Sequence, residues 1–322
     1  MKDILMILAM FAVMIFGLPL LIKGLPEPSG DAVQENSTPV FPDTLNVYLS
    51  DTGEIRNMTA EEYLEGCLAA QIALNYEPEA LKAQAAASAA YALRLMDDLR
   101  GSGKMPDGAD ISDDSRTCQP YFTPEKREEM YGASYGTYAG NIRAAAEYGK
   151  THIITYENEP IYAVYHAVSA GNTCPSEYIW GAAFPYLRAS ASAADREFIN
   201  FECVNEMKYE EIRRALIAYD AGIEIPADPA LWFTDINANE DGYVISAKIG
   251  KNTFSGGDLW RILGLRSTAF TVKYENGIFT FTTKGAGHGA GLSQYGADAM
   301  ALSGSSAADI LRHYYAGVNV PE

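Results

Sequence analysis

A run of alternating glycines near the C-terminus, GAGHGAGLSQYGA from Gly285 to Ala297, constrains the fold more than any other stretch. Glycine is the default residue where a backbone adopts φ > 0 or approaches another backbone closely. The run follows an expected strand, opens an expected helix, and fits the loose dinucleotide pattern G-x-G-x-x-A. Fewer than about forty residues remain after it, too few for the βαβ unit of a dinucleotide site. We therefore interpret the run as a tight strand-to-helix connection that holds His288.

Polar side chains follow this connection. His288 lies within it, and Ser293, Gln294 and Tyr295 stand at the start of the expected helix. The first backbone N–H groups of a helix have no partner inside the helix, and a neighbouring imidazole can donate or accept a hydrogen bond. Together these groups suit recognition of hydroxyl and amide groups, as on a sugar. A plain turn, in which the glycines only permit φ > 0, is the alternative.

A second polar stretch, YHAVSAGNT from Tyr165 to Thr173, ends an expected strand in a loop of small residues. His166, Ser169 and Thr173 are its polar members and are candidate site residues. An ordinary turn with a histidine at the strand end is the alternative. A Ser–His–Asp hydrolase is disfavoured because the chain has no G-x-S-x-G elbow.

A third stretch, CLAAQIALNYEPEALKAQAAASAAYAL from Cys67 to Leu93, predicts a helical hairpin. Thr59 and Glu62 form a capping-box pattern before its first helix. Pro78 opens the second helix, where the first turn tolerates proline. Alanines let the second helix approach its neighbours closely, so core packing is the default interpretation of this stretch.

Bulk composition narrows the classes of function. The chain has 322 residues, 48% of them hydrophobic, which favours a packed core over disorder. Its formal net charge is −18. Phosphates would be repelled by such a chain, so we expect no nucleic-acid partner and favour an uncharged or weakly charged substrate.

The N-terminal segment from Ile4 to Ile22 is long and apolar enough to cross a bilayer as a helix. No A-x-A site follows, so an uncleaved anchor is favoured over a cleaved signal peptide. We expect a transmembrane anchor over residues 1–23, a flexible linker over 24–43 and a domain of two intertwined lobes over 44–322. The expected location is the cell membrane, single-pass, with the domain outside the cytoplasm.

The order of elements along the domain indicates an α+β fold, a helix-rich lobe packed with antiparallel β-sheet, because helices come first and strands later. Asn276-Gly277 between alternating runs is a hairpin signal. The expected elements are a hairpin over 45–58, helices over 60–75, 78–100, 124–131, 137–150 and 208–219, strands over 153–156, 161–167, 243–249 and 270–274, and helices over 292–302 and 307–315.

The four cysteines are Cys67, Cys118, Cys174 and Cys203. Four cysteines allow three pairings, and the sequence does not choose among them. Cys174 and Cys203 are close enough along the chain for a local bridge, and buried thiols are the other interpretation. The chain has no C-x-x-C pair, so we expect no metal site and no cofactor.

The three polar stretches, in this order, resemble the stage II sporulation protein D family, which includes the amidase-enhancer proteins. The first reads EEYLEGCLAAQIALNYEPEALKAQAAASAAYAL, the second YHAVSAGNT followed by Trp180 and Pro185-Tyr186-Leu187, and the third GAGHGAGLSQYGA. The resemblance covers the chain from about Leu45 to the C-terminus, and the third motif is matched throughout.

The resemblance implies a role in the cell wall, in septal remodelling and engulfment of the forespore. The family's enzymes are lytic transglycosylases that act on peptidoglycan glycan strands already stripped of peptides, and they work with a membrane-bound amidase. One carboxyl group protonates the glycosidic oxygen. The 6-hydroxyl of the sugar then closes on the anomeric carbon and leaves a 1,6-anhydro end. Carried over position by position, the motifs assign substrate binding to Lys82, Gln84, Tyr91, His166, Ser169, Thr173, His288, Ser293, Gln294 and Tyr295.

The chain departs from the family at the acid itself. The family's glutamate aligns with Gln71, and an amide has no proton of suitable acidity to deliver. Loss of a general acid typically removes a factor of about 10² to 10⁴ in rate. Glu77, at the start of the next helix, is the candidate substitute. Two hypotheses therefore stand, a lytic transglycosylase and a catalytically inactive glycan-binding module that positions or activates an amidase.

Overall fold

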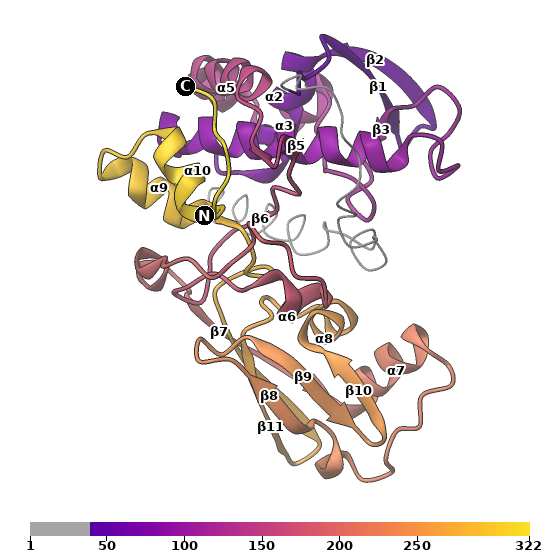
Figure 1. The fold of residues 1–322 in the computed structure, drawn as a ribbon. Coiled ribbons are helices and arrows are strands. Elements are labelled where there is room, and N and C mark those ends of the chain that lie inside the picture. Colours follow the sequence, from indigo (N-terminus) through magenta and orange to yellow (C-terminus); the bar gives the residue numbers. More distant parts are fainter. Residues whose placement is uncertain (1–38) are drawn as a thin grey trace. The chain divides into compact units, whose positions relative to one another are not determined.

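The computed structural model describes residues 39–322, which form two compact units of one interlaced chain (Figure 1). Unit 1 consists of two segments, the described chain up to Tyr165 and Ala297–Glu322. Unit 2 is the segment between them, His166–Gly296. The expected span over 4–22 lies outside the described residues. Within residues 39–322, no helix has the length and apolar character needed to cross a membrane.

Unit 1 begins with a hairpin of strands β1, Thr44–Leu49, and β2, Glu54–Thr59. The two strands pair antiparallel, with Thr44 opposite Thr59. A short strand, β3, Ile111–Ser112, adds to the other side of β1 in parallel register. The sheet order β2-β1-β3 thus places Ile111 and Ser112, for which the sequence predicted no helix or strand, beside the first hairpin.

Helices make up most of unit 1, and their starts follow local sequence signals. The Thr59 hydroxyl accepts a hydrogen bond from the Glu62 amide, 3.1 Å, at the predicted start of the first helix. Gly149 lies against the backbone of Ala85, where a Cβ atom would approach within 2.7 Å, so small residues permit the close packing of two helices. The helices are α2, Ala60–Gln71, α3, Pro78–Leu99, α4, Pro124–Tyr131, α5, Ala133–Thr151, α9, Gln294–Leu302, which begins in unit 2, and α10, Ala307–Tyr314.

Unit 2 contains two three-stranded antiparallel sheets, ordered β10-β9-β8 and β11-β12-β7. The Asn276-Gly277 turn joins β11 to β12 with both residues at positive φ, as the sequence predicted. The strands are β7, Glu202–Lys208, β8, Thr234–Ala238, β9, Val244–Ile249, β10, Asn252–Ser255, β11, Phe270–Glu275, and β12, Ile278–Lys284. The helices are α6, Ser176–Trp180, α7, Tyr209–Tyr219, and α8, Gly256–Leu263, with single 3-10 turns at Ala193–Glu197 and Pro229–Leu231.

The α+β class is confirmed, with several differences in detail. The strand expected over 161–167 is reduced to β6, Tyr165–His166. The amides of Ala163 and Val164 each donate a hydrogen bond to the carbonyl two residues earlier in the chain. These two amides therefore form tight local turns and do not pair with another strand. The turn between the strands expected over 153–156 and 161–167 is tighter than expected, because β4, Thr155–Tyr156, pairs with β5, Glu159–Pro160. A short strand, β13, Leu292–Ser293, precedes the helix expected from residue 292.

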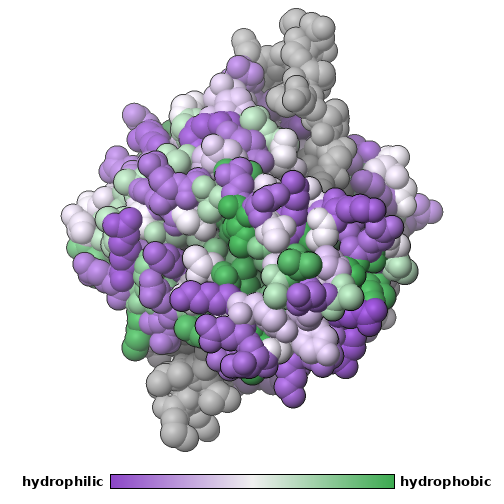
Figure 2. Space-filling view, turned by 90° about the horizontal axis from the view of Figure 1, so that it is seen from below, coloured by the Kyte–Doolittle hydropathy of each residue, from purple (hydrophilic) through white to green (hydrophobic). Residues whose placement is uncertain are grey.

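The four cysteines are free thiols, so the local bridge between Cys174 and Cys203 is not formed. Burial raises the pKa of the Cys67 thiol to about 12 and that of Cys118 to about 11. Both therefore stay protonated and unreactive near neutral pH. The face drawn in Figure 2 is mostly hydrophilic, with apolar side chains in small groups, as expected for a chain of net charge −18.

Candidate functional site

The glycine run of unit 2 adopts the backbone that the sequence predicted. Gly285, Gly287, Gly289 and Gly291 all have positive φ, between 71° and 102°. Residues with a side chain rarely adopt this conformation, so the alternation of glycine with Ala286, His288 and Ala290 is a backbone requirement.

The same glycines bring the run against the second polar stretch. A Cβ atom on Gly285 would lie 2.5 Å from the Val168 carbonyl oxygen, and one on Gly287 would lie 2.9 Å from the His166 Cβ. The Val168 and Ala286 backbones exchange two hydrogen bonds, at 3.1 and 2.7 Å. Two of the three motifs therefore form one backbone-to-backbone layer within unit 2, which places His166 beside His288.

Hydrogen bonds fix the two imidazoles and their tautomers. The His166 Nδ1 donates to the Ala290 carbonyl at 3.0 Å, which leaves its Nε2 as an acceptor in the neutral ring. The His288 Nδ1 accepts from the Ala290 amide at 3.1 Å, so its proton lies on Nε2. The backbone of Ala290 thus makes the Nε2 of His166 an acceptor and the Nε2 of His288 a donor. The centroids of the two rings lie 5.7 Å apart.

Burial keeps His166 neutral. The side chain is 4% exposed, and burial lowers its pKa from 6.5 to about 4, against a smaller opposing effect of the Ala290 carbonyl. Its Nε2 has no hydrogen-bond partner among residues 39–322. Since buried polar atoms are nearly always paired, this acceptor is suited to a ligand hydroxyl or a water.

Two tryptophans enclose His288. The ring of Trp180, at the end of α6, lies 5.1 Å from the imidazole centroid, and that of Trp260, in α8, lies 6.3 Å away. Trp180 is half-buried, whereas Trp260 is 3% exposed. The Trp260 Nε1–H, like the His166 Nε2, has no partner among the described residues. Of the two rings, only that of Trp180 is exposed enough to offer a face on which a sugar ring could stack.

Ser169 and Ser293 lie in the interior of unit 2, where both are bonded to a buried carboxylate. The Asp195 carboxylate accepts from the Ser169 amide at 2.8 Å and from the Ser293 hydroxyl at 2.8 and 3.0 Å. Burial raises the pKa of Asp195, and these hydrogen bonds oppose the rise. Both serines thus connect the second and third motifs through Asp195, and contact with a substrate stays a prediction for them.

The other candidate residues of unit 2 are also buried or in contact with other parts of the unit. The Thr173 hydroxyl donates to the Arg188 carbonyl at 3.2 Å and accepts from the Ser190 amide at 2.8 Å. Gln294 is 2% exposed at the start of α9. The Tyr295 amide donates to the Ala167 carbonyl at 3.1 Å, and its half-buried ring meets Phe198 edge-on.

In unit 1, Gln71 is the last residue of α2 and is 2% exposed. Its Nε2 donates to the Pro120 carbonyl at 2.8 Å. A carboxylate cannot make this bond, whereas a protonated carboxyl group can. This position therefore suits an amide as it stands, and a glutamate here could make the same bond only in its protonated form.

The remaining unit 1 candidates lie along α3. Gln84 is fully buried and bonds Ser88, and Tyr91 is 1% exposed with a hydroxyl that has no partner among the described residues. Lys82 is more accessible, but it forms an ion pair with Glu79 at 2.7 Å. Whether these three contact a glycan stays a prediction.

Glu77 precedes α3 as its N-cap and is half-buried. Its amide donates to the Asp298 carboxylate of α9 at 2.7 Å. Burial raises the pKa of Asp298, with Glu77 adding repulsion, although the Glu77 amide lowers it. The structure thus brings a second carboxyl group to Glu77 within unit 1.

Sequence reasoning missed Asp195, Trp260 and Asp298. Asp195 lies in SASAADREF and Asp298 in YGADAM, where no spacing distinguishes a site residue. Trp260 lies in a helix that the sequence analysis did not predict. Among residues 39–322, no group of three or more His, Cys, Asp or Glu side chains is placed to hold a metal ion.

Comparisons with known proteins point to one family. A family model described as "Stage II sporulation protein" matches residues 48–156. The chain is 34% identical to a stage II sporulation protein D of Bacillus amyloliquefaciens, over 87% of this chain and 79% of that protein. It is 32% identical to a protein of the same name in Bacillus subtilis, over 87% and 80%. It is 24% identical to a Bacillus subtilis amidase enhancer, over 58% of this chain and 34% of that protein.

Proposed function

Because the chain belongs to the stage II sporulation protein D family, whose relatives support a role in sporulation cell-wall remodelling, we propose that it binds peptide-stripped glycan strands and positions or stimulates a cell-wall amidase. In this proposal the protein is anchored through residues 4–22 with its domain outside the cytoplasm. The amidase link rests on the amidase-enhancer relative.

The observation that carries the binding proposal is the histidine pair of unit 2. The Nε2 of His166 is a buried acceptor without a partner among the described residues, and the Nε2 of His288 carries a proton. Sugar hydroxyl groups donate and accept at one atom, so they match such a pair. Trp180 provides an accessible aromatic face next to it. All these groups are uncharged hydrogen-bonding or aromatic groups, which suits recognition of sugar hydroxyl groups.

The absence of cleavage in this proposal follows from Gln71. Its amide nitrogen is bonded to the Pro120 carbonyl and has no acidic proton to give. A glutamate at this buried position would face that carbonyl. Burial and the hydrogen bond to the neutral form would both raise the pKa of its carboxyl group. The Gln71→Glu variant would therefore hold the protonated acid that the family's chemistry needs.

One observation favours the enzyme hypothesis instead. Asp298, whose pKa burial raises, lies beside Glu77 in the same unit as Gln71. A carboxyl group whose pKa is raised by burial is a candidate general acid. If the chain cleaves glycan, Asp298 or Glu77 supplies the proton.

A single experiment separates the hypotheses. The full-length protein is incubated with peptide-stripped glycan strands, binding is measured by co-sedimentation, and 1,6-anhydro ends are measured by mass spectrometry. We expect the natural chain to bind without forming anhydro ends. We expect Gln71→Glu to form them, and Gln71→Met, which has neither acid nor amide, to form none.

Further variants identify the groups involved. His166→Gln and Trp180→Ala should each weaken strand binding about tenfold, which equals about 1.4 kcal/mol, whereas the exposed control Tyr219→Ala should not. Anhydro ends from the natural chain, lost in Asp298→Asn or Glu77→Gln, would establish the enzyme instead. Absence of any strand binding would overturn both hypotheses.

A further inference from the structure

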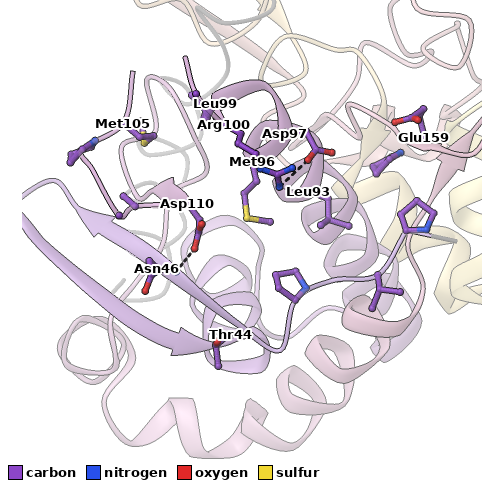
Figure 3. Close-up of a pocket in the computed structure, with 18 of the residues that line it drawn as sticks. Thr44, Asn46, Leu93, Met96, Asp97, Leu99, Arg100, Met105, Asp110 and Glu159 are labelled. Carbon is purple, nitrogen blue, oxygen red and sulfur yellow. Dashed lines mark hydrogen bonds and ion pairs between the residues drawn. The ribbon is translucent and has the colours of Figure 1, made fainter. Parts of the chain in front are cut away.

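A large open groove lies in unit 1, away from the motif residues described above. Its volume is about 920 Å³, which lies within the usual range for ligand pockets of roughly 300–1,000 Å³. Four segments form it, namely the start of β1, the last turns of α3, the following loop and the turn between β4 and β5 (Figure 3).

The floor of the groove is apolar. Leu93, Met96 and Leu99 lie three residues apart on one face of α3, and the Met96 side chain points into the middle of the groove (Figure 3). Met105 and four prolines contribute to the walls. The exposed Val40 stands among the lining residues with 79% of its surface accessible. Such a surface fits apolar side chains of a bound segment.

The rim of the groove is acidic. Its charged lining residues are Arg100 and the carboxylates of Asp97, Asp107, Asp110, Glu157 and Glu159. Asp97 pairs with Arg100 at 3.2 Å, and Glu159 pairs with Arg94 at 3.8 Å. The other three carboxylates have no ion pair within residues 39–322. The lining therefore has a net charge of −4 over 22 residues, a higher density than −18 over the 322 residues of the chain.

One edge of β1 is open where it meets the groove. The Asp43 carbonyl accepts a hydrogen bond from the Ala60 amide on the side of β1 that faces β2. The Asn46 carbonyl accepts one from the Asp110 amide on the opposite side. Backbone groups of a strand alternate between its two sides, so the N–H and C=O of Thr44 face the side of Asp110. Since β3 pairs only with Val47 and Tyr48, no described strand covers this end of the edge.

We propose that this groove binds an extended, basic segment of a partner protein, which adds to the open edge of β1. Apolar side chains of the segment would lie on Met96 and its neighbours, and lysine or arginine side chains would pair with Asp107, Asp110 and Glu157. Main-chain bonds to a sheet edge with alternate side chains in pockets are an established mode of peptide binding. The chain's own residues 24–38 are a poor fit, because they carry Glu27, Asp31 and Glu35 and no Lys or Arg.

The test uses the full-length protein and fluorescence anisotropy with labelled synthetic heptapeptides. The probe KVKVKVK is compared with EVEVEVE, which has the same apolar residues and the opposite charge. The groove variant Asp107→Asn/Asp110→Asn/Glu157→Gln should bind KVKVKVK at least tenfold more weakly than the natural chain. Asp110 accepts from the Asn46 amide at 2.7 Å, and the amide side chain introduced by Asp110→Asn keeps an oxygen that can accept the same bond.

A matched control removes the same number of charges elsewhere. The triple variant Glu206→Gln/Glu240→Gln/Glu275→Gln neutralises three exposed carboxylates of unit 2 and should change the affinity less than twofold. Thermal midpoints check that both triple variants are folded. Thr44→Pro, which removes the N–H that faces the groove, should weaken binding in the natural background.

Two results would overturn the proposal. The first is equal affinity for the lysine and glutamate peptides, or equal affinity of the two triple variants for KVKVKVK. The second is displacement of the lysine peptide by peptide-stripped glycan strands, which would make the groove a sugar site.

Discussion

Asp195 is the residue on which the second and third motifs of unit 2 both depend. It is fully buried and accepts hydrogen bonds from the Ser169 amide and the Ser293 hydroxyl. In Asp195→Asn the side chain loses its negative charge and one of its two acceptor oxygens, so its hydrogen bonds with Ser169 and Ser293 weaken. We expect a loss of about 2–3 kcal/mol in the free energy of unfolding, measured by denaturant titration. Ser293→Ala, which leaves the carboxylate in place, should lose less, and equal losses would contradict this role.

His166 makes stability depend on pH, again at the scale of one residue. In the unfolded chain the imidazole binds a proton near pH 6.5, whereas burial lowers its folded pKa to about 4. Well above pH 6.5 both states are neutral and the residue has no effect. As the pH falls from 6.5 to about 4, only the unfolded state gains the proton, so folding loses up to about 3 kcal/mol.

Comparison with His166→Gln isolates this contribution from those of other groups. The free energy of unfolding, measured between pH 7 and pH 4.5, should fall more steeply for the natural chain than for the variant. Parallel curves would show that His166 titrates normally in the folded protein.

At the scale of elements, the glycine run is a strand-to-helix connection with two separate requirements. Gly289 has a φ of 86°, and a Cβ atom there would lie 2.3 Å from the Tyr243 ring. Gly304, which follows α9, has a φ of 92° but no atom within 4 Å of the Cβ position. Substitution of Gly304 therefore tests the cost of backbone strain alone, whereas substitution of Gly289 tests backbone strain together with a steric clash.

We predict that Gly304→Ala costs about 1–2 kcal/mol through backbone strain alone. Gly289→Ala should cost about 1–3 kcal/mol more, because the Tyr243 ring must move. Chemical denaturation of both variants measures the difference. Equal costs would mean that the Tyr243 ring yields freely and that Gly289 is needed only for its φ.

The elements that the sequence predicted well have local causes. The helix start at Thr59, the proline at the start of α3 and the Asn276-Gly277 hairpin each rest on a few neighbouring residues. Helix α8, which was missed, also has local signals, because Ser255 caps its start and Gly264 ends it. Strand β3, which was missed as well, depends on a partner far along the chain. Ile111 is a strand residue because it lies beside Val47, and no pattern near Ile111 indicates this pairing.

At the scale of the whole molecule, the net charge of −18 is the dominant electrostatic feature. Like charges repel each other in the compact state, and salt screens that repulsion. Most of the ion pairs lie on the surface, where each contributes about 0–1 kcal/mol, so their loss in salt is the smaller effect. We expect the unfolding temperature to rise by a few degrees between about 10 and 300 mM NaCl, measured by calorimetry. A fall would show that the ion pairs outweigh the repulsion.

The sequence by itself determined the α+β class, most helix positions, the positive-φ glycine run and, through three motifs, the family. These follow from backbone preferences and short spacings, which are written in consecutive residues. Only the tertiary structure decided that Ser169 and Ser293 share Asp195, that Ala290 sets the tautomers of His166 and His288, and that Asp298 lies beside Glu77. Each of these depends on side chains distant in sequence, because burial and hydrogen bonding arise from packing and not from local order.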